Sequence, residues 1–343
     1  MLICSTMRNC IAFSIFIFLF ALTALQGQEA DSLSLPMNEL LISADRFQEK
    51  RKDLPRQIDL ITQKTIQQLN KQNTADLLFE IGNIYVQKSQ QGGGSPILRG
   101  FEANKVLLVL DGVRLNNAIY RGGHLQNVLR IDQQMLEKVE VLYGPGSLMY
   151  GSDALGGVVN FSSLKPNLEK PFQLAVMNRY SSVNKEQTQA ITLQGAYKKW
   201  GAIFHYGQST FGDLVQGKNR RSAWGDLGLR KVFQQRVGDS DQVVQNPNIH
   251  EQVGSAYQQQ NLMAKLNFQP NVYTQHLLSY YFSNTGNVPR YDRLSELNNG
   301  IPRFGDWYYG PETFQFLNYQ FSSQLMRTLW DEIRVIAAYQ QVN

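Results

Sequence analysis

The side chains that could carry catalysis or hold a metal are few and scattered through the 343-residue chain. No two histidines have the His-x-x-x-His spacing that places a metal-binding pair on one helix face. No Gly-x-Ser-x-Gly segment offers a nucleophile for acyl transfer. The sequence therefore predicts that the protein is not an enzyme and has no permanently bound cofactor or metal. The four histidines are His124, His205, His250 and His276.

Two glycine-rich segments could be mistaken for nucleotide-binding loops. The segment Gln91–Pro96 lacks the Gly-Lys-Ser/Thr that completes a phosphate-binding loop. The run Gly144–Gly151 has Met149 where a dinucleotide fingerprint needs its third glycine. We therefore interpret these glycines as backbone devices, which allow positive φ angles and close packing of chain segments.

The N-terminus has the composition of a secretory signal peptide. Arg8 precedes an apolar stretch from Ile11 to Leu25, and small residues lie before Gln28. The apolar stretch is shorter than the ~20 residues of a membrane span, so we expect cleavage near Gly27 rather than an anchor. Both cysteines, Cys4 and Cys10, lie in this leader, and the mature chain is expected to have neither disulfides nor thiolate chemistry.

Charge and composition limit the class of protein. The formal net charge of +5 comes without a dense Lys/Arg tract, so no nucleic-acid partner is predicted. The chain has 16 Tyr and 18 Phe, but no mature segment is apolar enough for a transmembrane helix. Abundant aromatic residues without apolar helices suit strands that are apolar on one face only.

The N-terminal part that carries the glycine runs is predicted to be mixed α/β up to about residues 164–170. Thr62 is expected to cap a helix that ends at Leu69, and Asn73 is expected to cap a helix over 75–81. Asp132 is expected to cap a third short helix. Strands are predicted at 84–86, at 106–110 before the Asp111-Gly112 turn, and at 139–143.

After residue 170 the apolar residues recur with a period of two. This pattern predicts seven strands, most of them near the ~9–11 residues that cross a bilayer with tilt. Long polar stretches at 213–254 and 285–312 separate some strands, and short links separate others, as in an outer-membrane barrel. A soluble β-sandwich is the alternative. The predicted strands are 172–182, 188–198, 201–211, 262–269, 275–283, 313–329 and 332–340.

Three motifs occur in an order and spacing that resemble the plug domain of TonB-dependent outer-membrane receptors. They are Ser95–Phe101 (SPILRGF), Val106–Arg114 (VLLVLDGVR) and Val139–Phe161, in which an additional Val159 departs from the family pattern. The plug residues that the resemblance singles out are Arg99, Gly100, Asp111, Gly112, Arg114, Gly144, Pro145, Gly146, Tyr150, Gly151, Gly156 and Gly157.

The resemblance extends to the segment between the leader and the plug. Residues Glu39, Leu40, Leu41, Ile42, Ser43 and Ala44 look like the family's TonB box. This short β-prone segment could add as an edge strand to a partner's sheet. The alternative is that it forms only the first strand of the plug.

The resemblance implies a mainly β fold, in which an α/β plug fills a 22-stranded transmembrane barrel. The implied division is a signal peptide (1–27), a periplasmic TonB-box segment (28–50), a plug (51–164) and the first part of the barrel (165–343). About seven of the 22 strands are then present, so the chain is expected to be a fragment. Arg99 and Arg114 are expected either to join plug to barrel or to form surface salt bridges.

The resemblance also implies a function in the Gram-negative outer membrane, among its lipids. TonB and its inner-membrane energising complex would drive uptake of an extracellular iron complex, either haem, a haemoprotein or a siderophore. Cobalamin or another metal chelate is the alternative ligand, and a passive porin or an adhesin is the alternative class.

Two segments resemble parts of haem and haemoglobin receptors in this family: Asn287–Glu296 and Asp306–Pro311. Another segment, Asn116–Asn127, follows the Val106–Arg114 motif, where the apical loops of such a plug lie. In this segment His124 is predicted as an axial ligand of haem iron, because imidazole suits iron. Tyr120 flanks this histidine, and Arg121 could pair with a carboxylate of haem or of a siderophore. The alternative is that His124 forms hydrogen bonds within the plug.

Overall fold

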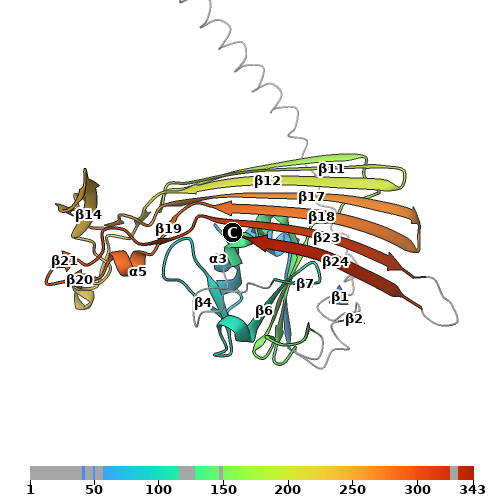
Figure 1. Cartoon of the computed structure of the whole chain (residues 1–343), viewed down its shortest axis with the longest axis horizontal. Helices are drawn as coiled ribbons and strands as arrows, with labels where there is room; N and C mark the ends of the chain where they lie inside the picture. Colours follow the sequence, from blue (N-terminus) through green and yellow to red (C-terminus); the bar gives the residue numbers. More distant parts are fainter. Residues whose placement is uncertain (1–40, 43–48, 51–56, 116–127, 147–149, 325–330) are drawn as a thin grey trace, which may run out of the picture. The chain divides into compact units, whose positions relative to one another are not determined.

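The computed structural model describes residues 41–42, 49–50, 57–115, 128–146, 150–324 and 331–343. Two main β-sheets organise this part of the chain: a five-stranded sheet inside an N-terminal α/β module (residues 57–164), and a separate seven-stranded sheet (Figure 1). The module lies against one face of the seven-stranded sheet. The predicted signal peptide falls outside the described residues.

The five-stranded sheet of the N-terminal module has the strand order β3-β8-β9-β6-β7, and β6 and β9 pair in parallel. Its apolar strands and two short α-helices enclose a buried core. The elements are β3 (Ile58–Thr62), α2 (Gln63–Leu69), α3 (Thr74–Phe79), β4 (Ile84–Gln87), β5 (Ser95–Leu98), η2 (Ala103–Lys105), β6 (Val106–Leu110), β7 (Val113–Arg114), η3 (Val128–Arg130), η4 (Gln133–Met135), β8 (Leu136–Tyr143) and β9 (Gly157–Ser163).

The helix caps in this module are those that the sequence predicts. The side chain of Thr62 accepts a hydrogen bond from the Thr65 amide, and Asn73 accepts one from Asp76. These bonds satisfy amides that have no partner within the helix. Two predicted extents were wrong: α3 ends at Phe79, and Asp132 caps only a single 3₁₀ turn.

The seven strands predicted after residue 170 are confirmed, and they form one antiparallel sheet in chain order (Figure 1). Short turns join β11 to β12 and β17 to β18 at one end, and the long connections lie at the other end. The strands are β10 (Phe172–Ser181), β11 (Glu186–Tyr197), β12 (Trp200–Phe211), β17 (Tyr257–Asn271), β18 (Thr274–Thr285), β23 (Glu312–Ser323) and β24 (Ile333–Val342).

The two faces of this sheet have the opposite polarity to those of a soluble β-sandwich. In β17, Asn261, Lys265 and Asn267 are buried under the N-terminal module, whereas Leu266 on the other face is 43% exposed. A soluble sheet would bury its apolar face and leave its polar face in water. A membrane barrel reverses this arrangement, because lipid covers the outside and the lumen is polar. The pattern therefore favours the barrel over the sandwich.

Aromatic side chains form a band on the exposed face at the short-turn end. Trp200 stacks on Phe268 with a centroid distance of 4.3 Å, and His276 lies 5.1 Å from Phe321. The His276 Nδ1 is 2.8 Å from the Tyr319 hydroxyl. Aromatic rings with polar edges collect at the interface between lipid and water in outer-membrane barrels, so this band indicates where such an interface lies.

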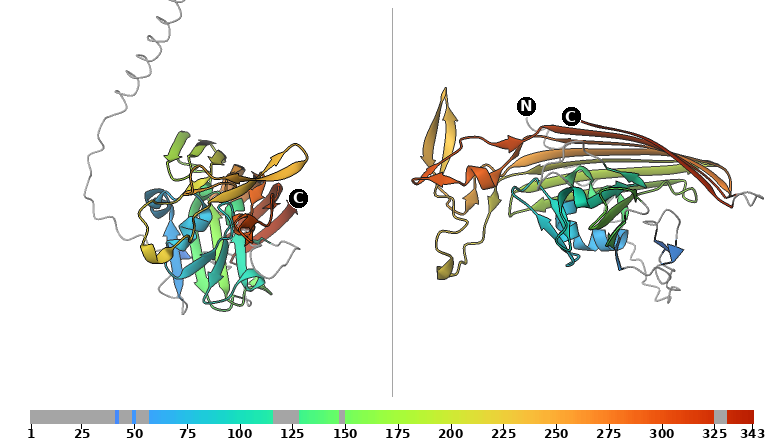
Figure 2. Two further views of the ribbon diagram at one scale, coloured as in Figure 1. Left: turned by 90° about the vertical axis from the view of Figure 1, so that its left-hand side faces the viewer. Right: turned by 60° about the horizontal axis from the view of Figure 1, so that its bottom comes forward.

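The long polar stretches are not structureless, contrary to the sequence-based expectation of loops. They contain short hairpins, one α-helical turn and one 3₁₀ turn, which gather beyond the long-loop end of the sheet (Figures 1 and 2). Among the residues described, no helix is long and apolar enough to span a membrane. The short elements are β13 (Leu214–Val215), η5 (Ser222–Trp224), β14 (Val232–Val237), β15 (Ser240–Gln245), β16 (Glu251–Gln252), β19 (Val288–Pro289), α5 (Tyr291–Leu294), β20 (Leu297–Asn298), β21 (Ile301–Pro302) and β22 (Tyr308–Tyr309).

Candidate functional site

The turn after β6 positions Asp111 at the interface between the N-terminal module and the seven-stranded sheet. All five residues of β6 are buried and apolar, so the strand is fixed in the core of the module. Asp111 and Gly112 then adopt φ angles of +47° and +80°, which reverse the chain into β7. Glycine tolerates the second of these angles without steric cost. The turn thereby directs a carboxylate toward the sheet.

The Asp111 carboxylate is held by groups from both parts of the protein. From the sheet, the Lys265 ammonium lies 2.8 Å away, and the Tyr281 hydroxyl donates a hydrogen bond. From the module, the Ser163 amide and hydroxyl donate at 2.8 and 2.7 Å. The Asp111 carbonyl also accepts a hydrogen bond from Gln320 Nε2 at 2.6 Å. One plug-motif residue is thus bonded to β17, β18 and β23 together.

The environment of Asp111 favours its ionised form. Burial alone would raise the pKa of this carboxyl, but the positive charge of Lys265 and the donated hydrogen bonds outweigh burial and lower the pKa. The Asp111 side chain is therefore a carboxylate at neutral pH. The Lys265 side chain is fully buried and that of Asp111 is only 6% exposed.

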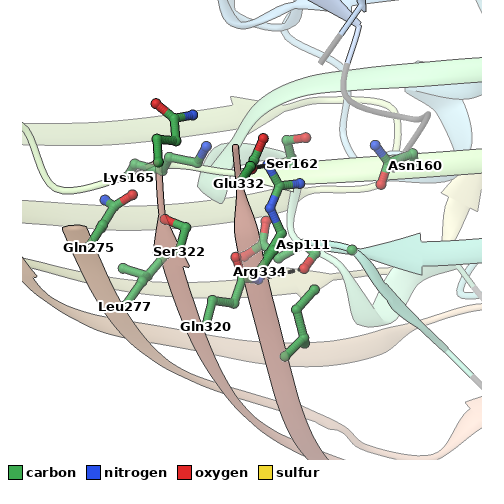
Figure 3. Close-up of a pocket in the computed structure, with 13 residues that line it drawn as sticks. Asp111, Asn160, Ser162, Lys165, Gln275, Leu277, Gln320, Ser322, Glu332 and Arg334 are labelled. Carbon is green, nitrogen blue, oxygen red and sulfur yellow. Dashed lines mark hydrogen bonds and ion pairs between the residues drawn. The ribbon is translucent and has the colours of Figure 1, made fainter. Parts of the chain in front are cut away.

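A polar cavity of about 420 Å³ opens beside Asp111, between the module and strands β18, β23 and β24 (Figure 3). Amide, hydroxyl and charged side chains line most of it, and Arg334 and Glu332 form an ion pair of 2.8 Å at its edge. Asn160 Oδ1, on its wall, is buried without a hydrogen-bond partner in the described protein. Such a space suits water, because buried polar atoms otherwise lose hydrogen bonds.

Two further contacts join the module to the sheet. The first lies at the long-loop end of β23, and the second lies in the middle of β12. Arg130 makes a bidentate pair with Glu312, at 2.6 and 2.8 Å. Asp132 lies 3.3 Å from His205 Nε2, and a Cβ added at Gly207 would come within 2.6 Å of the Asp132 carboxylate. The absence of a side chain at Gly207 therefore leaves room for this contact.

Asp132 is also kept ionised by its surroundings. Burial raises the pKa of its carboxyl, but hydrogen bonding and charge interaction with His205, together with the Gln134 amide, lower it overall. The interface thus holds two buried plug carboxylates, each opposite a basic side chain of the sheet.

The glycine run after β8 has the backbone role proposed from the sequence. Gly144 and Gly151 have φ angles of +91° and +80°. A Cβ at Gly146 would lie 2.6 Å from a Val158 methyl group, and one at Gly156 would overlap Phe101. These glycines therefore allow turns and close approach of segments, as the interpretation as a backbone device requires.

Arg99 and Arg114 do not reach the seven-stranded sheet with their guanidinium groups in the described structure. Arg114 donates to the Tyr150 carbonyl at 2.9 Å and pairs with Asp153 at 2.7 Å. Arg99 donates to Gln57 at 2.6 Å. Both side chains thus bond within the module, Arg114 through a salt bridge as in the alternative interpretation, while the Arg114 carbonyl accepts a hydrogen bond from Gln340 of the sheet at 2.7 Å.

The long connections carry four arginines that each lie over an aromatic ring. Arg290 and Arg293, near α5, lie 5.2 Å and 5.7 Å from the ring centres of Tyr309 and Trp307. The other two pairs are Arg230 over Tyr291 and Arg303 over Phe304. Cations over aromatic faces are stabilised electrostatically. Three of these arginines are also paired with carboxylates of the same connections, Arg290 with Asp292 and both Arg293 and Arg303 with Glu296. This end of the molecule therefore presents aromatic surface among balanced charges.

Several predicted residues lie outside the described part of the chain: Glu39, Leu40, Ser43, Ala44, Tyr120, Arg121 and His124. Of the predicted TonB box, Leu41–Ile42 forms a short strand, β1, that pairs with β2 (Glu49–Lys50). Among the described residues, no group of three or more His, Cys, Asp or Glu side chains could hold a metal ion.

Sequence reasoning missed the sheet residues that meet the module, above all Lys265, Tyr281 and Glu312. One signal was available for Lys265. It is a cationic residue at the inward position of an otherwise uncharged alternating strand, and such a charge must find a partner when it is buried. The identity of the partner depends on the fold, because Asp111 is 154 residues away in the sequence.

Comparison with known proteins agrees with this architecture. Residues 50–158 match the family model described as the TonB-dependent Receptor Plug Domain. The vitamin B12 transporter BtuB of Vibrio vulnificus CMCP6 is 35% identical over 125 residues, which cover 35% of this chain and 20% of that protein. In strain YJ016 the match is 29% over 163 residues, covering 47% of this chain. The chain thus spans at most 25% of the length of these relatives.

Solved structures with the same fold are transporters and receptors. The FrpB iron transporter of Neisseria meningitidis has a TM-score of 0.65 at 17% identity, over 82% of this chain and 40% of that one. The ferric enterobactin receptor PfeA of Pseudomonas aeruginosa has a TM-score of 0.57 at 13% identity, over 83% and 41%. The match over residues 50–158 shows that the N-terminal module is a TonB-dependent receptor plug domain, and the structural likenesses show that the chain has the fold of the corresponding part of these outer-membrane receptors.

Proposed function

We propose that the protein mediates energised uptake of an iron complex across the outer membrane. The observation that carries the proposal is the plug module docked through the buried Asp111–Lys265 pair and the Asp132–His205 contact on the polar face of a sheet whose other face is apolar. A plug held this way closes the lumen beside it to free diffusion. Passage of a ligand then requires that part of the plug move, and that movement needs an energy source.

The energy source in this proposal is TonB with its inner-membrane complex, acting on residues 39–44. Pairing of Leu41–Ile42 with Glu49–Lys50 supports the idea that this segment takes extended backbone. Extended backbone can pair with the edge of a partner's sheet. Main-chain hydrogen bonds would then transmit the pulling force, and they do not depend on the identity of the side chains.

The proposed ligand is haem, a haemoprotein or a ferric siderophore. The aromatic rings at the long-loop end, among them Tyr309 and Trp307, support this class, because flat apolar surface suits a planar or aromatic ligand. Structural relatives are titled an iron transporter and a ferric enterobactin receptor. The alternative is cobalamin, since BtuB relatives are named vitamin B12 transporters, or another metal chelate, since one structural relative is a copper transporter.

Deletion of residues 39–44 tests the proposal. Cells that produce the variant should bind radiolabelled haemin, ferric enterobactin or cyanocobalamin as before, but should no longer accumulate the label. The matched control removes six residues nearby, 31–36, and should leave accumulation intact. Accumulation that survives the deletion of 39–44 would refute energised transport and favour a passive porin. Binding without accumulation in the unaltered protein would favour an adhesin. The probe that accumulates identifies the ligand class.

The proposed haem-binding role of His124 has its own test. Purified receptor is titrated with haemin, and the visible absorbance spectrum is compared with that of His124→Ala. An axial imidazole changes the iron spectrum, so the substitution should alter it. An identical spectrum would rule out axial ligation, and matched substitutions at Tyr120 and Arg121 would then show whether these flanking side chains contribute to haemin affinity.

A further inference from the structure

We propose that Lys265 and Tyr281 form a fixed docking point for the Asp111–Gly112 turn, and that this turn stays attached to the sheet while other plug–sheet contacts separate during transport. The inference rests on the proposed transport function. It concerns which part of the plug moves, and its test includes a readout that does not depend on the ligand.

The first support is that bonds from three strands converge on one residue. Lys265 belongs to β17, Tyr281 to β18, and Gln320 to β23, and each bonds to Asp111. Tyr281 also lies 2.7 Å from the Ser163 hydroxyl, so the same ring joins β9 of the plug. Movement of this turn would break the bonds from Lys265, Tyr281 and Gln320 at once, because these three share Asp111.

The second support is the difference in burial between this contact and the others. At the docking point the Lys265 side chain has no solvent exposure and Asp111 has 6%. In the Arg130–Glu312 pair the exposed fractions are 11% and 31%. An ion that loses its partner must be hydrated, and water already reaches Glu312. The ammonium of Lys265 has no such access, and the neighbouring cavity is lined by Asp111 but not by Lys265. The Arg130 contact is therefore the one that can open.

The third support is the place of the turn in the plug sheet. In the order β3-β8-β9-β6-β7, the turn joins the two strands at one edge, and β3 is at the opposite edge. The N-terminal segment that TonB would pull leads into β3. The pulling force is therefore applied at β3, the edge strand that is farthest in the strand order from the docking point.

Chemical bridging distinguishes a fixed contact from a moving one. A Cβ at Gly112 would lie 3.5 Å from the Ile336 side chain, so Gly112→Cys with Ile336→Cys can be joined by a short bifunctional thiol reagent. The matched pair is Arg130→Cys with Glu312→Cys, at the contact expected to separate. A cysteine at position 112 strains the turn by itself, because φ there is +80°, so each double-cysteine variant is compared before and after bridging. Bridging at 112–336 should lower accumulation of the transported probe no further, whereas bridging at 130–312 should abolish it. Loss of accumulation in both bridged variants would overturn the fixed docking point.

A labelling experiment separates failure of this inference from failure of the proposed function. Single cysteines at Gly112 and Arg130 are exposed to a charged maleimide in energised cells and in cells treated with an uncoupler. Energisation should increase labelling at 130 and leave labelling at 112 unchanged. Energy-dependent labelling at 112 would refute the fixed docking point, even in a receptor that takes up none of the probes. Absence of uptake with the expected labelling would refute only the assigned ligand class.

Discussion

The strongest energetic prediction concerns the Asp111–Lys265 pair. At a separation of 2.8 Å, the Coulomb attraction is ~6 kcal/mol if the effective dielectric constant is about 20. Desolvation of two buried ions offsets much of this attraction, so the pair adds little net stability compared with well-packed apolar residues. Removing one partner is different, because it leaves a buried charge without compensation and costs about 3–5 kcal/mol.

We therefore expect Lys265→Met and Asp111→Asn each to weaken plug docking by about 3–5 kcal/mol, and the double variant to lose far less than the sum. The assay is urea release of the plug from receptor in detergent micelles, followed by a fluorophore on a cysteine at the exposed plug residue Leu155. The free energy comes from linear extrapolation to zero denaturant. The control pair, Lys71 with Glu80, is partly exposed and should show a coupling of about 1 kcal/mol or less.

The outcome that would refute this reasoning is additivity. If the two single losses add in the double variant to within ~0.5 kcal/mol, the two side chains do not act as a pair. Small losses in both single variants would likewise show that water hydrates the remaining charge, and that the burial of Lys265 does not hold in solution.

Three further predictions follow from the same interface. The lowered pKa of Asp111 means that its stabilisation is present above the unfolded value near 3.9 and is lost as pH falls through the folded pKa. Urea midpoints for plug release should therefore stay level from neutral pH down to about 5, fall below about 4, and fall less in Asp111→Asn. Gly156→Ala should lower the free energy of unfolding by ~1–3 kcal/mol because its methyl group overlaps Phe101, whereas Gly217→Ala, which meets nothing within 4 Å, should change it by less than ~0.5 kcal/mol. Gly207→Val should displace the Asp132 carboxylate and lower the urea midpoint without shifting the melting of the barrel, as near-ultraviolet and far-ultraviolet circular dichroism would show.

The parts of the fold that were predictable from the sequence are those set by local patterns. Period-two alternation located all seven strands, and Thr62 and Asn73 marked two helix starts through their side-chain caps. The Asp111-Gly112 turn was also apparent, because Asp and Gly tolerate the required φ angles. Each of these features depends on neighbours a few residues away.

The parts that could not be predicted depend on register between distant segments. Which sheet residues face Asp111 follows from the pairing of β17 with β18, where Lys265 lies opposite Ser279. A shift of one residue would turn Lys265 toward lipid and leave Asp111 without its partner. The short hairpins in the long connections were missed for other reasons. Most of their strands have two residues, too few to show a periodicity, and the six-residue strands β14 and β15 do not alternate apolar with polar residues.

The plug–sheet interface combines one charged cluster with several adaptable contacts, and this division has a physical basis. Away from Asp111, long sheet side chains donate to plug main-chain carbonyls: Arg179 to Gln72, Gln259 to Leu129, and Gln340 to Arg114. A main-chain carbonyl accepts hydrogen bonds whatever the side chain of its residue. The flexible side chains that donate to it can follow small shifts of the plug backbone. Such bonds contribute only about 1 kcal/mol each, because their loss on separation is largely offset by hydrogen bonds to water. A plug held mainly by exchangeable bonds can rearrange at low cost, and a buried ion pair at a single turn can preserve its register while it does so.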